Sequence, residues 1–383
     1  MDTTADHGTT LVPPLRGTIR DRLAALGWSP FLVTLGALVL LVWLGRDMTF
    51  YHDEFAFLLL RDLSLDGIFG PHNEHLSATL VVLYRALVGT VGTGSYWPYL
   101  AVTFALHVAV AWIVYLVVRR ETSATWALGA MAVVLLLGSG GDDILWAFQS
   151  GTIGAVAAGM AAVVIAPRRP AVAAILLTVA LATSGGGLAF LAGTAFHLLL
   201  VRPRALPWLL LPIGLYLGWY VLFATRAVSP GLHGLAEYVL TGLAASAAGA
   251  IGTTWLAAGS VVLLALAFGL GRAQRIPPVV LALLVSGVAF FVLAGLVRAQ
   301  LGAEQATAPR YVYVVAPAIV IAGAVLVARI PGRMGILVGT AVFTAAIVGN
   351  TLLLFETHDR LASKIECEKS MTPIARGSAG NPC

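Results

Sequence analysis

Residues 97–120 read WPYLAVTFALHVAVAWIVYLVVRR, and this stretch decides the fold class. Its first 22 residues contain no Asp, Glu, Lys or Arg. A helix needs about 20 apolar residues to cross about 30 Å of hydrocarbon, so this run is long enough to span a membrane. Arg119 and Arg120 close the run, and arginines collect in cytoplasmic loops. The stretch therefore predicts a membrane-spanning helix whose end faces the cytoplasm.

The composition of the whole chain agrees with this stretch. The 383 residues are 59% hydrophobic and 11% charged, with a mean hydropathy of +0.91. A soluble protein carries about 25% charged residues, so a soluble globular enzyme and a disordered chain are both excluded. The sequence pI of about 9.4 does not indicate a nucleic-acid partner, because the arginines form no single basic face. We expect an all-α polytopic membrane protein.

Apolar runs of suitable length predict eleven membrane-spanning helices in one transmembrane domain over residues 28–355. The expected spans are 28–46, 97–118, 124–140, 147–166, two short spans within 171–201, and then 206–224, 254–271, 277–297, 311–329 and 334–355. The two short spans are separated by the Ser184–Gly187 run. Residues 235–253 are expected to form an interfacial segment on the outer surface.

Residues 76–92 decide which loops face outward. This segment is apolar but contains Arg85 near its middle, where an arginine costs about 2.5–3.5 kcal/mol in a spanning helix. If the segment lies on the outer surface instead, the basic pairs of five later loops all face the cytoplasm. We therefore expect a cytoplasmic tail over 1–27, a first outer loop with amphipathic surface helices over 47–96, and an extracytoplasmic tail over 356–383.

The charges divide unequally between the two sides in this topology. The inner side holds 13 basic and 4 acidic residues, and the outer side holds 10 basic and 14 acidic residues. Frequent Ala, Gly, Val and Arg with only two lysines is typical of a GC-rich bacterial genome. We expect a multi-pass protein of the bacterial inner (cytoplasmic) membrane whose acids act outside the cytoplasm.

The first outer loop carries the candidate catalytic acids, Asp53 and Glu54. They come a few residues after the first span, so they lie at the membrane surface, where an amphiphilic substrate presents its head group. An acid there can serve as general base for an acceptor hydroxyl within about 2.6–3.2 Å. The alternatives are a solvated loop acid and an N-cap of a helix over 54–62.

The same loop contains three candidate substrate-binding residues, His72, Glu74 and His75. They are also potential metal ligands. Their spacing matches neither a zinc finger nor the His-Glu-x-x-His helix, so no metal is assigned and a divalent ion stays open.

A second outer cluster holds Asp142, Asp143, Trp146 and Gln149. One of the two acids is expected to cap the following helix. A helix cap needs only one of the two carboxylates. The alternative roles are to bind a metal, to orient an acceptor, or to form hydrogen bonds with a sugar whose face stacks on Trp146.

Arg310 and Tyr311 stand where an outer loop enters the tenth span. An arginine at this depth can bind a phosphate with two parallel hydrogen bonds, although interfacial Arg and Tyr also anchor spans without further function. Arg226 and Arg298 compete for the phosphate role. The Ser184–Gly187 run is either a phosphate-binding nest or a turn.

The order of these motifs resembles the GT-C glycosyltransferase superfamily, whose members include protein O-mannosyltransferases and lipid A aminoarabinose transferases. Asp53-Glu54 matches the acidic motif of its first outer loop, and Pro71–Leu76 looks like the stretch that follows this motif in a bacterial branch. Trp146–Gln149 and Arg310-Tyr311 look like further pieces of that branch.

The resemblance covers about residues 30–330 and implies an inverting hexosyl- or pentosyltransferase with a polyprenyl-phosphate sugar as donor. Asp53 would be the base and Arg310 would hold the lipid phosphate. The acceptor would be a lipid, glycan or protein hydroxyl on the outer face, among the membrane lipids. Many relatives carry a folded acceptor-binding domain after the last span, and this chain has only about 28 residues there.

The alternative function is a transporter or lipid-linked glycan flippase without transferase activity. Transporters place polar residues in the middle of spans, where His107 and His197 are the main candidates here, unless each is simply hydrogen-bonded within the bundle. Separately, Cys367 and Cys383 share the outer tail and can form a disulfide, or they can remain two free thiols.

Overall fold

The computed structural model describes residues 27–224 and 231–370, and every regular element in these ranges is a helix. The expected all-α class is therefore confirmed, and the only pairing of the strand type in the described ranges is an isolated bridge between His72 and His75. The cytoplasmic tail expected over 1–27 lies, except for Gly27, outside the described residues.

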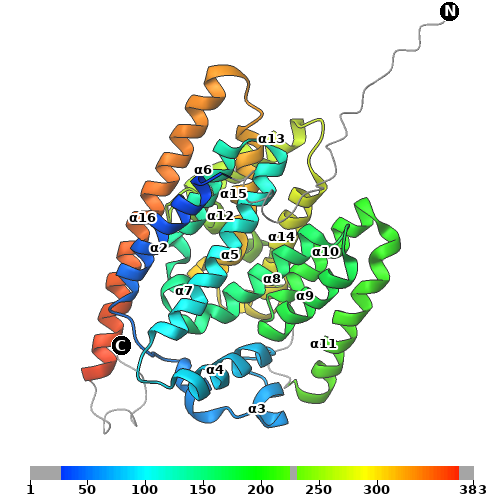
Figure 1. Ribbon diagram of the computed structural model, residues 1–383. Coiled ribbons are helices and arrows are strands. Elements are labelled where there is room, and N and C mark those ends of the chain that lie inside the picture. The colour runs from blue at the N-terminus through cyan, green and yellow to red at the C-terminus, as the bar shows by residue number, and fades with distance from the viewer. Residues whose placement is uncertain (1–26, 225–230, 371–383) are drawn as a thin grey trace, which may run out of the picture.

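The helices form one bundle (Figure 1). The α-helices are α2 (Ser29–Gly45), α3 (Leu65–Phe69), α4 (Ala78–Val91), α5 (Trp97–Glu121), α6 (Ala124–Leu135), α7 (Gly141–Leu145), α8 (Ser150–Ile165), α9 (Pro170–Thr183), α10 (Gly187–Val201), α11 (Leu210–Phe223), α12 (Leu235–Ala250), α13 (Leu256–Arg272), α14 (Pro278–Arg298), α15 (Pro309–Val327) and α16 (Gly332–Ser370). The other helical segments are the π-helix η1 (Ala56–Leu60) and the 3₁₀ segments η2 (Gly138–Gly140), η3 (Ala147–Gln149), η4 (Pro203–Leu209), η5 (Ala299–Leu301) and η6 (Ala303–Thr307).

Seven described helical stretches are long and apolar enough to cross a membrane. They are Trp97–Glu121, Ala124–Leu145, Ala147–Ile165, Pro203–Phe223, Pro278–Leu301, Pro309–Val327 and Gly332–Glu368. Six further apolar helices, α2, α4, α9, α10, α12 and α13, are shorter. Long apolar helices that expose much of their surface are typical of a membrane protein, because lipid covers that surface.

Prolines begin several of these helices. Proline lacks a backbone N–H and has a fixed φ, so it fits the first turn of a helix, where no intrahelical partner is needed. The prolines in such positions are Pro30, Pro98, Pro170, Pro278 and Pro309. The sequence thus marks where many of the spans start.

The helix α4 lies across one end of the bundle together with α3, as expected for a surface segment (Figure 1). Arg85 of α4 does not face the lipid. Its guanidinium donates to the carbonyl oxygens of Phe57 and Leu58 at 2.6 and 2.7 Å. These carbonyls belong to η1, so Arg85 ties the surface helix to the loop that precedes it.

The outer interfacial position expected for residues 235–253 stays a prediction, and the second half of α12 is buried against other helices of the bundle. Small residues allow this close packing. Gly242 lies directly against the ring of Phe291, and Gly259 of α13 lies against the backbone of Ala244. Any larger side chain at either glycine would force the helices apart.

The last helix does not end at residue 355, where the final span was expected to finish. It continues without a break to Ser370. Leu354, Leu361 and Ile365 are spaced seven and four residues apart on one face, and all three are buried. The chain expected to form a tail is thus, for its first 15 residues, a packed helix.

A glycine-rich break lets α16 approach the centre of the bundle. Gly138 lies against the backbone of Asn350 and Leu354, and a side chain there would collide with both. The Asn350 side chain accepts from the backbone N–H of Ser139 at 3.2 Å and donates to the carbonyl of Gly249 at 3.0 Å. This contact fixes α16 to the segment that leads into α7.

Candidate functional site

Glu54 is fully buried at the end of the bundle where α4 lies. The Tyr84 hydroxyl donates to one carboxylate oxygen at 2.7 Å, and the Tyr96 hydroxyl donates to both at 3.1 and 3.2 Å. The backbone N–H of Tyr51 donates to the carboxylate at 2.9 Å. Three groups from different parts of the sequence therefore hold this side chain in one position.

Burial dominates the ionisation of Glu54. Desolvation raises its pKa from 4.5 to about 7, against the opposing effect of the hydrogen bonds from Tyr84, Tyr51 and Tyr96. The carboxyl is consequently close to half-ionised at neutral pH. Its buried, fully bonded position suits a structural role better than direct contact with a substrate.

Asp53 has different surroundings from its neighbour. Its side chain is 32% exposed and lies 3.8 Å from the His52 imidazole. His52 itself has φ +53, a left-handed conformation that is uncommon outside glycine. Because the chain turns sharply here, one acid of the pair points into the protein and the other stays accessible. The expected N-cap of a helix over 54–62 is wrong, since the helix there is the π-helix η1 with no side-chain cap.

The two acids of α7 also point in different directions, as neighbours on a helix do. Asp142 pairs with Arg360 of α16, whose Nη2 lies 2.5 Å from Oδ1. Asp143 is fully buried, and neither of its oxygens has a hydrogen-bond partner in the described part of the chain. The charge of Arg310 acts on Asp143 from the side of α15.

Trp146 lies next to the first outer loop, whereas Gln149 is buried and contacts a residue of α8. The Trp146 ring is 5.3 Å from Tyr51 and stacks at 6.3 Å on His52. The Gln149 side chain is buried and accepts from the Thr152 hydroxyl at 2.7 Å. The aromatic ring is therefore the better candidate for contact with a sugar.

His72 and His75 flank a tight turn. Each donates its backbone N–H to the carbonyl of the other at 3.0 Å, and the residues between them, Asn73 and Glu74, have φ +45 and +70. Two left-handed residues in succession are typical of a type I′ turn, and Glu74 is an unusual occupant of one. Gly185 of the Ser184–Gly187 run lies against the His75 ring, so that run joins this turn.

Burial favours the neutral form of both histidines. Desolvation lowers the pKa of both, and the charges of Arg61 and Arg298 lower those of His72 and His75 respectively. Within 27–224 and 231–370, however, no three His, Cys, Asp or Glu side chains gather as metal ligands would. The described residues therefore include no cluster of ligands for a divalent ion.

Arg310 is exposed at the start of α15, with its guanidinium 5.3 Å from the Tyr311 ring. Arg298 lies at the end of α14, and the charges of both arginines act on the buried Tyr238. Arg226, the third candidate, lies outside the described residues.

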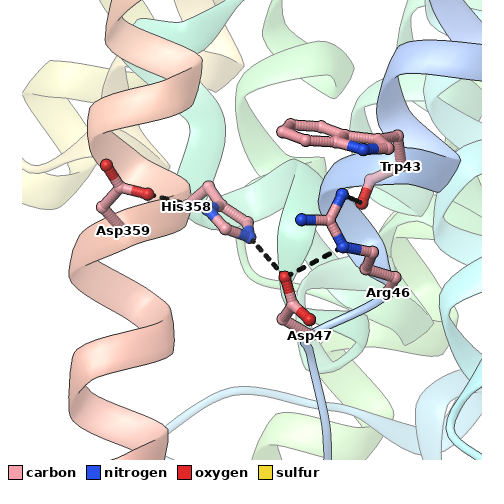
Figure 2. A network of polar contacts seen from close by, with 5 residues as sticks. All are labelled: Trp43, Arg46, Asp47, His358 and Asp359. Carbon is pink, nitrogen blue, oxygen red and sulfur yellow. Dashed lines mark hydrogen bonds and ion pairs between the residues drawn. The ribbon is translucent and has the colours of Figure 1, made fainter.

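Several residues of this region have no signal in the local sequence. Tyr84 and Tyr96 are 30 and 42 residues from the Glu54 that they hold. His358 lies between Asp359, at 2.9 Å, and Asp47, at 3.3 Å, and Figure 2 shows these side chains meeting beside Arg46. Only the apolar spacing that continues past residue 355 could have indicated that α16 reaches this end.

The two mid-span histidines are bound inside the bundle. His107 lies 2.8 Å from the Tyr313 hydroxyl and 3.1 Å from the Leu135 carbonyl, and His197 lies 2.7 Å from the Val163 carbonyl. These contacts account for both residues without a transport pathway. The disulfide expected between Cys367 and Cys383 stays a prediction, because Cys383 lies outside the described residues.

Comparison with known proteins adds no relative. No protein-family model matches the chain, and no curated protein or solved structure matches it.

Proposed function

We propose that the chain is a membrane glycosyltransferase of GT-C-like architecture. It crosses the inner membrane eleven times, with its N-terminus in the cytoplasm and its C-terminus outside. It transfers a hexose or pentose from a polyprenyl-phosphate donor to a lipid, glycan or protein hydroxyl at the outer face. The observation that carries the proposal is the division of the acid pair, with Glu54 buried and fixed while Asp53 stays accessible.

Asp53 is the general base in this proposal. It removes the proton of the acceptor hydroxyl, whose oxygen attacks the anomeric carbon of the donor sugar. The bond from that carbon to the phosphate oxygen breaks, and the electron pair leaves with the lipid phosphate. A single displacement of this kind inverts the anomeric configuration. Glu54 holds the loop in place and takes no part in the proton transfer.

Arg310 stabilises the leaving group in this proposal. Negative charge develops on the phosphate oxygen as the bond breaks, and a guanidinium at that position lowers the barrier. Arg310 is exposed at the start of α15, so its guanidinium is accessible to a phosphate. A lipid-linked donor fits the setting, because its tail stays in the bilayer while its phosphate lies at the surface.

The test is transfer by the purified full-length chain in lipid nanodiscs, with undecaprenyl-phosphate-linked hexoses and pentoses as donors. We expect Asp53→Asn to lose at least about 100-fold in rate, in line with typical general-base contributions. Asp66→Asn is the control, because Asp66 is an exposed acid of the same outer loop. Equal rates for wild type and Asp53→Asn would show that Asp53 is not the base. A wild-type protein that transfers none of these sugars would contradict the proposed function.

A further inference from the structure

The end of α16 extends beyond the hydrocarbon and reaches the candidate site. Thirty-nine residues at about 1.5 Å each give a helix of about 58 Å, roughly twice the thickness of the hydrocarbon. After Arg333 in its first turn, the next charged residue is Glu356, and charged residues continue to Lys369. Figure 1 shows this end of α16 on the side of the bundle where α3 and α4 lie.

The first contact of this extension is with α7. Arg360 binds Asp142 through both of its terminal nitrogens, at 2.5 Å and 3.4 Å. One turn earlier, Thr357 packs directly on Gly141, where any side chain would collide with it. A two-pronged arginine contact fixes the direction of a carboxylate as well as its position. Arg360 therefore orients Asp142.

The second contact is with the segment that enters the first outer loop. His358 reaches Asp47, which also pairs with Arg46 at 3.3 Å, and the Arg46 guanidinium lies 4.0 Å over the Trp43 ring (Figure 2). This segment continues directly into Tyr51 and Asp53. The α16 extension thus holds both chain segments that carry the candidate acids.

The third contact is electrostatic and involves Tyr51. The charges of Glu368, Asp142 and Asp53 all act on its phenol, and Arg360 is the cation that opposes them. These charges come from three separate elements: the end of α16, α7 and the first loop. The Tyr51 ring lies 5.3 Å from the Trp146 ring, and His52 stacks on Trp146 at 6.3 Å. The aromatic side chains thus lie beside the segment that carries the accessible Asp53.

The two acids of α7 are held from different elements. Asp142 pairs with Arg360 of α16, whereas the charge of Arg310 from α15 acts on the buried Asp143. We propose that the extension of α16 holds the acceptor side of the site in place, with Arg360 as the positioning residue for Asp142. The inference rests on the proposed function: the hydroxyl-bearing head group of the acceptor binds beside Tyr51 and Asp53, and the donor phosphate binds on the Arg310 side.

The experiment separates the two substrates by kinetics. Octyl glycosides serve as acceptor probes for the full-length protein in nanodiscs, each substrate being varied while the other is saturating. We expect Arg360→Gln to raise KM for the acceptor about tenfold or more, the scale of a hydrogen bond to a charged group, with KM for the donor unchanged. Arg360→Lys should give an acceptor KM between those of wild type and Arg360→Gln, because lysine keeps the positive charge but cannot make the two-pronged contact of a guanidinium.

A matched control is Arg120→Gln, which breaks a surface ion pair with Glu121 at the end of α5 and should leave both KM values at wild-type levels. An acceptor KM within twofold of wild type for Arg360→Gln, or a change confined to the donor KM, overturns the inference while the proposed function stands.

A second arm does not depend on turnover. Hydrogen exchange of residues 138–147 and 47–55 should accelerate in Arg360→Gln and stay at the wild-type rate in Arg120→Gln. If exchange in these segments is unaffected, Arg360 is not a positioning residue, whether or not the wild-type protein transfers sugar.

Discussion

At the scale of single residues, the buried Glu54 makes the stability of the protein depend on pH. The folded protein keeps its proton up to about pH 7, whereas an unfolded chain releases it near 4.5. The folded state is therefore destabilised as pH rises through this window, by about 3 kcal/mol in all, and is constant above it. We expect the melting temperature in detergent to fall from pH 5 to 8 in wild type and to vary much less in Glu54→Gln. The same slope in both proteins would contradict this account.

Tyr96 connects Glu54 to the second acidic cluster at the same scale. Its hydroxyl donates to Glu54 and accepts from the backbone N–H of Ala147 at 2.8 Å. Tyr96→Phe leaves both groups short of a partner, so we expect a loss of about 1–3 kcal/mol in stability, seen as a lower melting temperature. Tyr115→Phe is the control, because the buried Tyr115 hydroxyl has no partner in the described chain. A Tyr96→Phe protein as stable as Tyr115→Phe would show that the bridge contributes nothing.

At the scale of elements, the position of α16 depends on a glycine. A side chain at Gly138 would collide with the backbone of Asn350 and Leu354, and backbone cannot rotate away. We expect Gly138→Ala to reduce the yield of monodisperse protein in size-exclusion chromatography severalfold, because α16 can no longer dock. Gly89→Ala should behave like wild type or slightly better, since Gly89 of α4 faces open space. Normal yield for both variants would mean that α16 docks without this close approach.

At the scale of the whole molecule, the direction of insertion is open to direct measurement. Gly94 follows α4, Gly271 lies near the end of α13, and neither has an atom within 4 Å of a new side chain. With both native cysteines replaced by serine, an impermeant maleimide should label Gly94→Cys in intact cells and Gly271→Cys only after permeabilisation. The opposite pattern would invert the topology, and equal labelling from one side would refute the span count.

The sequence by itself determined that this is a membrane protein and that its fold is all-α. Long apolar runs ending in arginine pairs can be satisfied only by helices in a bilayer, because hydrocarbon offers no partner to an unpaired backbone group. It also predicted a surface position for α4, because Arg85 is costly in a span, and it singled out the two acidic pairs. These inferences are local, since they depend on composition within about 20 residues.

Only the tertiary structure decided what each acid touches. Two adjacent carboxylates in the chain, Asp53 and Glu54, differ because Tyr84 and Tyr96 come from distant segments to bury one of them. The same is true of Asp142, whose partner Arg360 lies 218 residues away. The burial of α12 against its neighbours and the long course of α16 had no signal in the sequence, because apolar and small side chains suit lipid and protein contacts equally. Which contact forms depends on packing among all the helices, and that has no signature in any single stretch of sequence.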